Sequence, residues 1–272
     1  MSLALVRLIP TDTAVPFIKA RLVAFFISVA LILGSITAFA TLGLNFGIDF
    51  RGGTAIEVKT QGPADTGALR EVLSGLDLGD VQVQGFGAED EALVRVGLVS
   101  SERVNEIEGY TVANDAEAQQ AVRQMVSLAL EEAFPGIVFQ KTESLSPQVS
   151  GELVVAGATS IGVALFLMLI YIWFRFEWQF GIGAIIALSH DVISTIGLFA
   201  LIQHEFNLAT VAAVLTIAGY SINDTVVVFD RVRENMRKYK TMDFSDLLNL
   251  SINDTLSRTT LTSFTTLLAL VA

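Results

Sequence analysis

Five long apolar stretches alternate with polar segments along this chain. They cover residues 22–48, 153–174, 178–203, 206–229 and 259–272, and only His190, Asp191 and Asp224 interrupt them. An α-helix needs about 20 mostly apolar residues to cross a lipid bilayer. The pattern therefore predicts a polytopic α-helical membrane protein with four complete spans and the start of a fifth. Because the fifth stretch holds only fourteen residues, we expect the natural chain to continue beyond it.

The first stretch also resembles a secretory signal. Lys19 and Arg21 precede it, and Ala38-Phe39-Ala40 has the form of a cleavage site. The apolar core of a signal peptide has only about 7–15 residues. Since this stretch is longer and more spans follow, we expect an uncleaved anchor.

The polar segment between the first two spans has the pattern of a compact α+β domain. Ile56 and Val58 alternate with Glu57 and Lys59, as in a strand with one buried face. Asn114 and Glu117 have the spacing of a capping box, which predicts a helix start. The expected elements are a strand at 56–59, a helix at 69–76, a hairpin at 81–98, a helix at 114–134 and a strand at 137–141. This β-α-β-β-α-β order is that of the ferredoxin-like fold.

Lysine and arginine positions predict the orientation in the membrane. Basic residues precede the first span, occupy the turn at Arg175 and follow the fourth span, whereas the turn at 203–207 has none. Short basic loops face the cytoplasm. We therefore expect a cytoplasmic segment 1–19, a first span at 20–44, an outer domain at 45–148 and a bundle of spans two to five at 149–272, with a cytoplasmic loop 231–254.

Two surface features accompany that arrangement. Aromatic residues crowd the turn at Arg175, as at a membrane interface. Residues 243–254 have the pattern of an amphipathic helix on the cytoplasmic face, with a plain connector as an equal alternative.

Composition excludes several classes of site. Among 272 residues, 52% are hydrophobic, there is no cysteine, and the formal net charge is -11. Disulfides and thiolate metal sites are thus impossible, and two histidines leave little scope for a histidine metal site. A nucleic-acid binder usually carries a basic patch, so nucleic acid is not an expected partner. Residues 45–148 hold 17 acidic and 7 basic residues. This indicates a solvated surface or, alternatively, a face that repels or selects polypeptide.

Asp224 is the first candidate for chemistry, because ionisable residues inside a span are costly and are functional by default. Desolvation and a nearby cation pull the pKa of such a carboxylate in opposite directions, which suits a group that takes and gives a proton. The alternative is a static, paired carboxylate that fixes helix packing. Helical spacing places Thr216, Tyr220 and Asn223 on the face of Asp224.

Arg258 and Asp191 are the next candidates. If the fourth and fifth spans pack antiparallel, Arg258 reaches the depth of Asp224 and could pair with it; otherwise it is an ordinary basic flank. Threonines at helical spacing follow it and could bind neighbouring helices. Asp191 is either a second relay group or a buried structural acceptor. Adjacent helical residues do not share a face, so His190 is the weaker candidate.

The segment Gly47-Ile48-Asp49-Phe50-Arg51-Gly52-Gly53-Thr54 joins the first span to the outer domain. Paired glycines permit positive φ and close backbone approach. A phosphate loop would need a Gly-Lys-Ser/Thr end, which is missing. A tight structural hinge is the simplest interpretation of this junction.

These motifs resemble the SecF family of bacterial export proteins. The matching segments are GIDFRGGT at 47–54, ALSHDV at 187–192, LTIAGYSINDTVVVFDRVREN at 215–235 and SINDTLSRT at 251–259. The tyrosine, the Asn-Asp-Thr and the Asp-Arg-x-Arg-Glu-Asn are more similar to SecF than to SecD. The resemblance runs from about residue 17 to the end, although the outer domain matches in layout more than in motif.

The resemblance implies a six-span subunit of the bacterial inner membrane that pairs with SecD beside the SecYEG channel and its accessory membrane subunits. It implies a non-enzymatic role, in which the proton gradient helps to complete export of a translocating polypeptide on the periplasmic side. Asp224 matches the family's relay aspartate and Arg258 its relay arginine. No cofactor is implied beyond the coupling ion, expected to be the proton, with sodium left open. The polar face expected to support the relay comprises Tyr220, Asn223, Thr225, Thr255, Thr259 and Thr262, and the junction motif comprises Asp49, Arg51, Gly52 and Gly53.

Three other classes of protein compete with this interpretation. An intramembrane aspartyl protease needs two carboxylates that share a proton, but the expected Gly-x-Gly-Asp surrounds neither Asp191 nor Asp224. A structural subunit without its own proton relay fits the same spans. A small-molecule exporter of the same superfamily would need larger paired outer domains.

Overall fold

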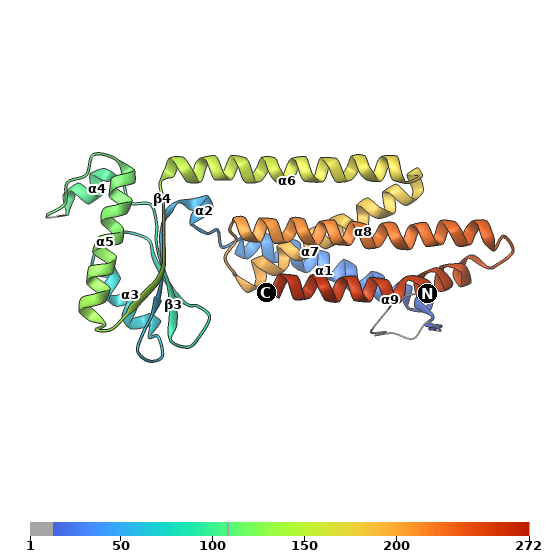
Figure 1. The fold of residues 1–272 in the computed structure, drawn as a ribbon, viewed down its shortest axis with the longest axis horizontal. Helices are drawn as coiled ribbons and strands as arrows, with labels where there is room; N and C mark the ends of the chain where they lie inside the picture. Colours follow the sequence, from blue (N-terminus) through green and yellow to red (C-terminus); the bar gives the residue numbers. More distant parts are fainter. Residues whose placement is uncertain (1–12, 108, 272) are drawn as a thin grey trace, which may run out of the picture. The chain divides into compact units, whose positions relative to one another are not determined.

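The computed structural model describes residues 13–107 and 109–271 of the chain. They form two compact units, one of residues 13–45 with 160–271 and the other of residues 46–107 with 109–159. The first unit is a helical bundle and the second is an α+β domain, and each is described by itself (Figure 1).

Four helices of the described chain have the length and composition of membrane spans, as the hydropathy pattern predicts. A short 3-10 helix, η1 (Phe17–Ala20), leads into the first of them, which spans 26 residues from Phe17 to Leu42. These helices are α1 (Arg21–Leu42), α6 (Pro147–Arg175), α7 (Trp178–Ile202) and α8 (Leu208–Lys238). The protein is therefore a multi-pass helical membrane protein, and α6 begins in the α+β unit and continues into the bundle.

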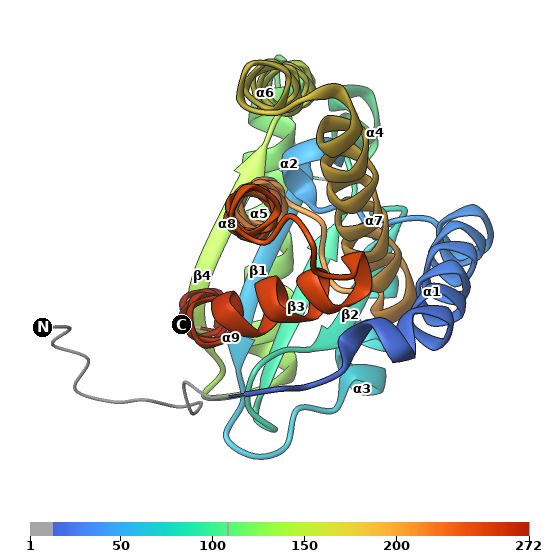
Figure 2. The ribbon, with the colours of Figure 1, turned by 90° about the vertical axis from the view of Figure 1, so that its right-hand side faces the viewer.

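Helix α7 packs between α1 and α8 in the bundle (Figure 2). Gly197 on α7 lies against Ser35 of α1, where an added Cβ would collide with the Ser35 backbone. Such small residues let membrane helices approach closely. On the other face of α7, Ala184 packs with Ile222 and Val226 of α8 in a small buried cluster. The bundle thus has little buried core, and most of its apolar side chains point outward.

The end of α1 is tied to the turn between α7 and α8. The Gln203 side chain donates to the carbonyl of Gly43 at 3.1 Å, and the Asn45 side chain donates to the carbonyl of Gln203 at 3.0 Å. The Phe206 N–H donates to the Asn45 carbonyl at 2.8 Å. These bonds satisfy backbone groups that the helix ends leave open.

The last helix, α9 (Phe244–Val271), differs from the expected separate amphipathic helix and fifth span, because both lie in one continuous helix. In Figure 2 its first part runs across the view and its last part is seen end-on, so the helix bends. Ser251, Asn253 and Thr255 each donate a side-chain hydrogen bond to a carbonyl of the preceding turn. Such back-bonding competes with the helical ladder and bends helices.

The α+β unit contains a four-stranded antiparallel sheet in the order β2-β3-β1-β4. The strands are β1 (Gly53–Lys59), β2 (Val81–Gly85), β3 (Glu91–Val96) and β4 (Val138–Leu145). Each predicted strand is present, and Ile56 pairs with Val94 on one side and with Thr142 on the other. Alternation in β1 sends Ile56 and Val58 to one face of the sheet and Ala55 to the other.

Two helices cover one face of this sheet, α3 (Thr66–Ser74) and α5 (Asp115–Ala133) (Figure 1). Leu69, Leu73 and Leu130 are fully buried in the shared core. Asn114 caps α5 by accepting from the Glu117 N–H at 2.9 Å, while Glu117 accepts from the Ala113 N–H at 2.8 Å. The capping box therefore exists, with its return bond one residue earlier than the standard pattern.

Two short helices were not predicted. Helix α2 (Ile48–Arg51) packs Ile48 against the second face of the sheet, and α4 (Ser101–Glu106) lies between β3 and α5. Asp115 accepts a hydrogen bond from the Ser101 N–H at 2.8 Å. This bond lowers the pKa of the Asp115 carboxyl, because it stabilises the ionised form.

Candidate functional site

Asp224 lies in the middle part of α8, half-buried and facing a cavity of about 430 Å³. Its Oδ1 atom is buried and receives no hydrogen bond from the described residues. The cavity is built by α7, α8 and α9, and its lining is Asp191, Ile217, Tyr220, Ser221, Asp224, Thr225, Ser263, Thr266 and Leu267. Because most buried polar atoms in proteins are hydrogen-bonded, an orphaned carboxylate oxygen marks a site that needs an explanation.

Asp191 on α7 lines the same cavity, so the structure brings the two intramembrane carboxylates together. Its Oδ2 accepts from the Ser221 hydroxyl, and its Oδ1 lies 2.9 Å from Nδ1 of His190. Asp191 thus has a partner at each oxygen, whereas Asp224 does not. The side chains of His190 and Asp191 contact each other although adjacent helical positions do not share a face.

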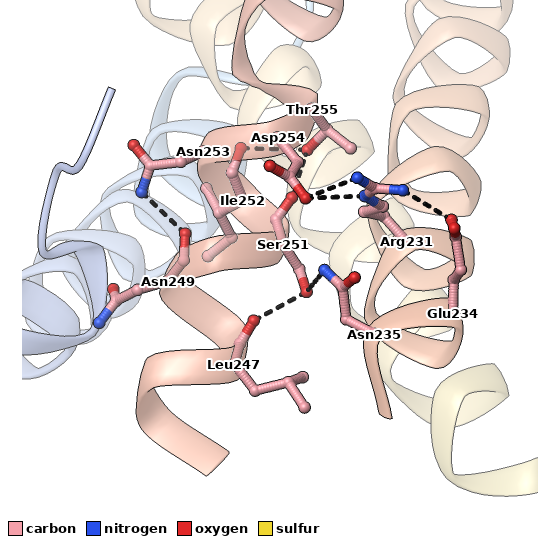
Figure 3. A network of polar contacts seen from close by, with 10 residues as sticks. All are labelled: Arg231, Glu234, Asn235, Leu247, Asn249, Ser251, Ile252, Asn253, Asp254 and Thr255. Carbon is pink, nitrogen blue, oxygen red and sulfur yellow. Dashed lines mark hydrogen bonds and ion pairs between the residues drawn. The ribbon is translucent and has the colours of Figure 1, made fainter. Parts of the chain in front are cut away.

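Polar contacts near the loop between α8 and α9 fix how these two helices are aligned (Figure 3). Arg231 donates to Asp254 at 2.8 Å, and Asn235 donates to the Ser251 hydroxyl at 3.0 Å. Asn235 and Ser251 are buried, with 1% and 0% exposure. A slip of one turn would separate both pairs and leave buried polar groups unpaired, so the contacts select this alignment.

That alignment determines where Arg258 lies relative to Asp224. The two helices run antiparallel, and Arg231 pairs with Asp254. Extending this pairing residue by residue along both helices places Asp224 opposite the turn around Thr262 of α9. Arg258 then sits about one helical turn, roughly 5 Å, closer to the loop between the helices. Its charge still acts on Asp224 through space, but no ion pair joins the two residues within 4.0 Å in the described chain.

The threonine stripe of α9 differs from the expected helix-to-helix contacts. The hydroxyls of Thr255, Thr262, Thr265 and Thr266 donate to carbonyls of their own helix. Thr259 is the exception, because its buried Oγ1 has no partner among the described residues. Most of the stripe therefore satisfies itself, which lets these polar residues sit in an apolar helix without bonds to a neighbour.

The other predicted polar residues of α8 differ in whether they line the cavity. Thr225 lines the cavity, and Tyr220 lines it while 44% exposed. Asn223 is exposed and lines no part of the cavity. The polar face of α8 is therefore split, with one edge on the cavity and the other directed away from it.

The junction motif forms the start of the α+β unit. Asp49 and Arg51 lie in α2, and Gly52 and Gly53 follow with φ of 71° and 108°. A Cβ at Gly53 would approach the Val96 carbonyl far inside contact distance. Gly53 is thus required by the close passage of β1 beside β3, and Gly52 is favoured by its positive φ, in agreement with a tight structural junction.

Sequence reasoning missed Ser221 and the pair formed by Arg231 and Asp254. Ser221 precedes Asp224 by three residues and so shares its side of the helix, a spacing that could have identified it. Asn235 and Ser251 carry no such signal, because their partners lie on another helix. Across the described residues, no group of three or more His, Asp or Glu could hold a metal ion.

The described chain is thus a multi-pass helical membrane protein with an α+β domain between its first two spans and an unpaired carboxylate inside the fourth. Comparison with known proteins identifies its kind more closely. Residues 125–272 match the family model of the SecD/SecF protein export membrane protein, C-terminal part, and residues 37–64 match the SecD/SecF GG motif. The chain belongs to the SecF family of protein translocase subunits.

Individual relatives support that assignment. The protein translocase subunit SecF of Cereibacter sphaeroides is 47% identical over 98% of this chain and 80% of its own length. The SecF subunit of Rhodobacter capsulatus is 44% identical over 97% of this chain and 79% of its own length. The crystal structure of SecDF from Thermus thermophilus, described as a translocon-associated membrane protein, matches with a TM-score of 0.79 at 31% identity. That match covers 96% of this chain and 34% of the SecDF chain.

Proposed function

We propose that this protein is a proton-driven, non-enzymatic subunit of a SecD–SecF complex that assists protein export beside the SecYEG channel and its accessory subunits. The observation that carries the proposal is the buried, unpartnered Oδ1 of Asp224 on a cavity inside the membrane span. A carboxylate of this kind changes its interactions when it binds a proton, which a satisfied carboxylate such as Asp191 does less readily.

The proton acts through Arg258. When Asp224 is ionised, the guanidinium of Arg258 is attracted toward it from about one turn away on α9. When Asp224 binds a proton, that attraction is lost and α9 is free to shift against α8. Movement of one charge across the membrane potential supplies about 2.3 kcal/mol per 100 mV, which is enough to bias a helix shift.

The shift reaches the α+β domain through the first span. Asn45 is tied to the turn between α7 and α8, and the chain enters the domain through Gly52 and Gly53 directly afterwards. Helix movement at α7 and α8 therefore pulls on the start of β1. The domain, a ferredoxin-like unit in this proposal, converts the pull into movement of the emerging polypeptide.

The expected surroundings follow from the distribution of basic residues. With its N-terminus in the cytoplasm, the chain has its basic loops inside and residues 45–148 in the periplasm, in the bacterial inner membrane. In this proposal SecD supplies the other half of the membrane bundle. The translocating polypeptide and the lipid bilayer are the remaining partners.

A structural subunit without its own relay is the second candidate. It is favoured by Asp191, whose oxygens are both engaged by Ser221 and His190, as in a fixed packing contact. If Asp224 acts in the same way, it contributes to helix packing and not to proton transfer.

Export in inverted membrane vesicles separates the two functions. Vesicles would contain the full-length chain with SecD, as wild type, Asp224→Asn or the control Asp246→Asn, with and without an imposed proton gradient. Asp246 is exposed on α9 and lies away from the cavity, so its substitution by asparagine removes the same charge without touching the site. We expect Asp224→Asn to lose the gradient-dependent increment while the control keeps it. Equal responses in all three, with the complex assembled, would establish the structural subunit.

A further inference from the structure

Arg258 is a cation between two carboxylates. It makes no ion pair within 4.0 Å in the described chain, and it is exposed on α9. Asp224 lies about one turn deeper in the bundle, and Asp254 precedes Arg258 by four residues on the same helix. Residues four apart on a helix are neighbours on one face, and an acidic residue placed before a basic one is the favourable order.

One oxygen of the Asp254 carboxylate is already bound by an arginine of α8. Its Oδ2 accepts from both Nε and Nη2 of Arg231 at 2.8 Å, and Arg231 also donates to Glu234 at 2.7 Å (Figure 3). The Oδ1 atom of Asp254 receives no hydrogen bond from the described residues. One oxygen is therefore fixed by α8 while the other is available to a second cation.

The charges of five residues around Arg258, namely Arg231, Arg258, Asp224, Asp254 and Glu234, balance when Asp224 is neutral. Arg231 and Arg258 carry two positive charges, and three negative charges come from Asp224, Asp254 and Glu234. Protonation of Asp224 leaves two charges of each sign. Asp191 faces Asp224 from α7, but its oxygens are engaged by Ser221 and His190.

We propose that Asp254 is the alternate counter-ion of Arg258, a positioning residue that receives the guanidinium whenever Asp224 is protonated. A proton entering from the outer side binds the Asp224 carboxylate and gives a neutral acid; Arg258 stays charged and turns from Asp224 to Oδ1 of Asp254. When the proton leaves toward the cytoplasm, the restored Asp224 carboxylate draws Arg258 back. The inference rests on the proposed function, because it names the second position of the same arginine.

The alternative is that Asp254 only anchors α9 to Arg231, and an exchanged pair distinguishes the two roles. Arg231→Asp combined with Asp254→Arg restores an ion pair between the helices but places a positive charge beside Arg258. In the vesicle assay, we expect Asp254→Asn to lower the gradient-dependent increment about twofold to fivefold, as loss of a partly exposed pair does. The exchanged pair should remain as defective, and Asp246→Asn should match wild type. Recovery in the exchanged pair would overturn the proposal.

A structure of the full complex carrying Asp224→Asn tests the inference without reference to export. Because asparagine mimics the neutral acid, Arg258 should lie within ion-pair distance of Asp254 in that variant. In the double variant Asp224→Asn with Asp254→Asn, the Arg258 side chain should lose that position. An Arg258 that stays apart from Asp254 in the first variant would contradict the proposal, even if Asp224 proves essential for export. Conversely, the contact between Arg258 and Asp254 could be observed even if export failed to respond to the gradient, so the two proposals can fail separately.

Discussion

The α+β domain and the membrane bundle are stabilised in different ways. In the domain, side chains such as Ile56, Leu69 and Leu130 are fully buried in one core shared by the sheet and two helices. In the bundle, Phe166, Ile186 and Leu201 are more than half exposed on their helices. Lipid is as apolar as these side chains, so burying them against protein gains little. A few polar contacts therefore carry much of the specificity of the bundle, and changing them changes function before it changes the fold.

The largest effect expected from this contrast is in the domain core. Leu130→Ala on α5 removes a side chain with 0% exposure, and we expect the domain to lose about 2–5 kcal/mol of its free energy of unfolding. The change leaves a cavity that the sheet and helices cannot close. Hydrogen exchange of the β1 and β3 amides in the full-length protein measures the loss.

Leu128→Ala is the matched control, because Leu128 lies on the same helix and is 52% exposed. Its exchange rates should stay close to those of wild type. If the two variants behaved alike, the domain would not be stabilised by the core described above.

A smaller loss of stability is expected when the polar contact that aligns α8 with α9 is removed. Ser251→Ala removes the only acceptor of the buried Asn235 side chain amide in the described chain. Hydrogen bonds between membrane helices contribute about 0.6 kcal/mol on average, so we expect a destabilisation of that order. Unfolding of the full-length chain by SDS in mixed micelles would measure it.

Ser257→Ala serves as the control, since Ser257 is exposed on the same helix and the gain in helix propensity from serine to alanine is the same. A difference between the two variants isolates the contact with Asn235. Identical unfolding curves would mean that the alignment of α8 and α9 depends on apolar packing alone.

The sequence was informative where local patterning decides structure. Hydropathy alone identified the four spans, and alternation at Ile56 and Val58 identified β1, because each depends on neighbours in the chain. The short helices α2 and α4 were missed, since four and six residues carry too little periodic signal. The continuity of α9 was missed because the polar residues 251–255 suggested the end of a helix. Their side chains in fact bond back to carbonyls of the same helix.

The site was predictable only in part, for a related reason. Asp224 stands out because a charge in a span is unusual, and the structure places Asp191 on the same cavity. The bond from Ser221 to Asp191 and the offset of Arg258 depend on how two helices are aligned, which no single helix encodes. Their interpretation as a relay stays a proposal.

The most direct test of the central claim is the protonation of Asp224 itself. Infrared difference spectra of the full-length SecD–SecF complex in membranes would be recorded as the pH is lowered, for wild type, Asp224→Asn and Asp246→Asn. All exposed carboxyls add to the protonated-carboxyl absorption as the pH falls. The account predicts one further component of that absorption in wild type and in Asp246→Asn, which is missing in Asp224→Asn. An absorption that is the same in Asp224→Asn as in wild type would contradict it, because the proton would then be carried elsewhere.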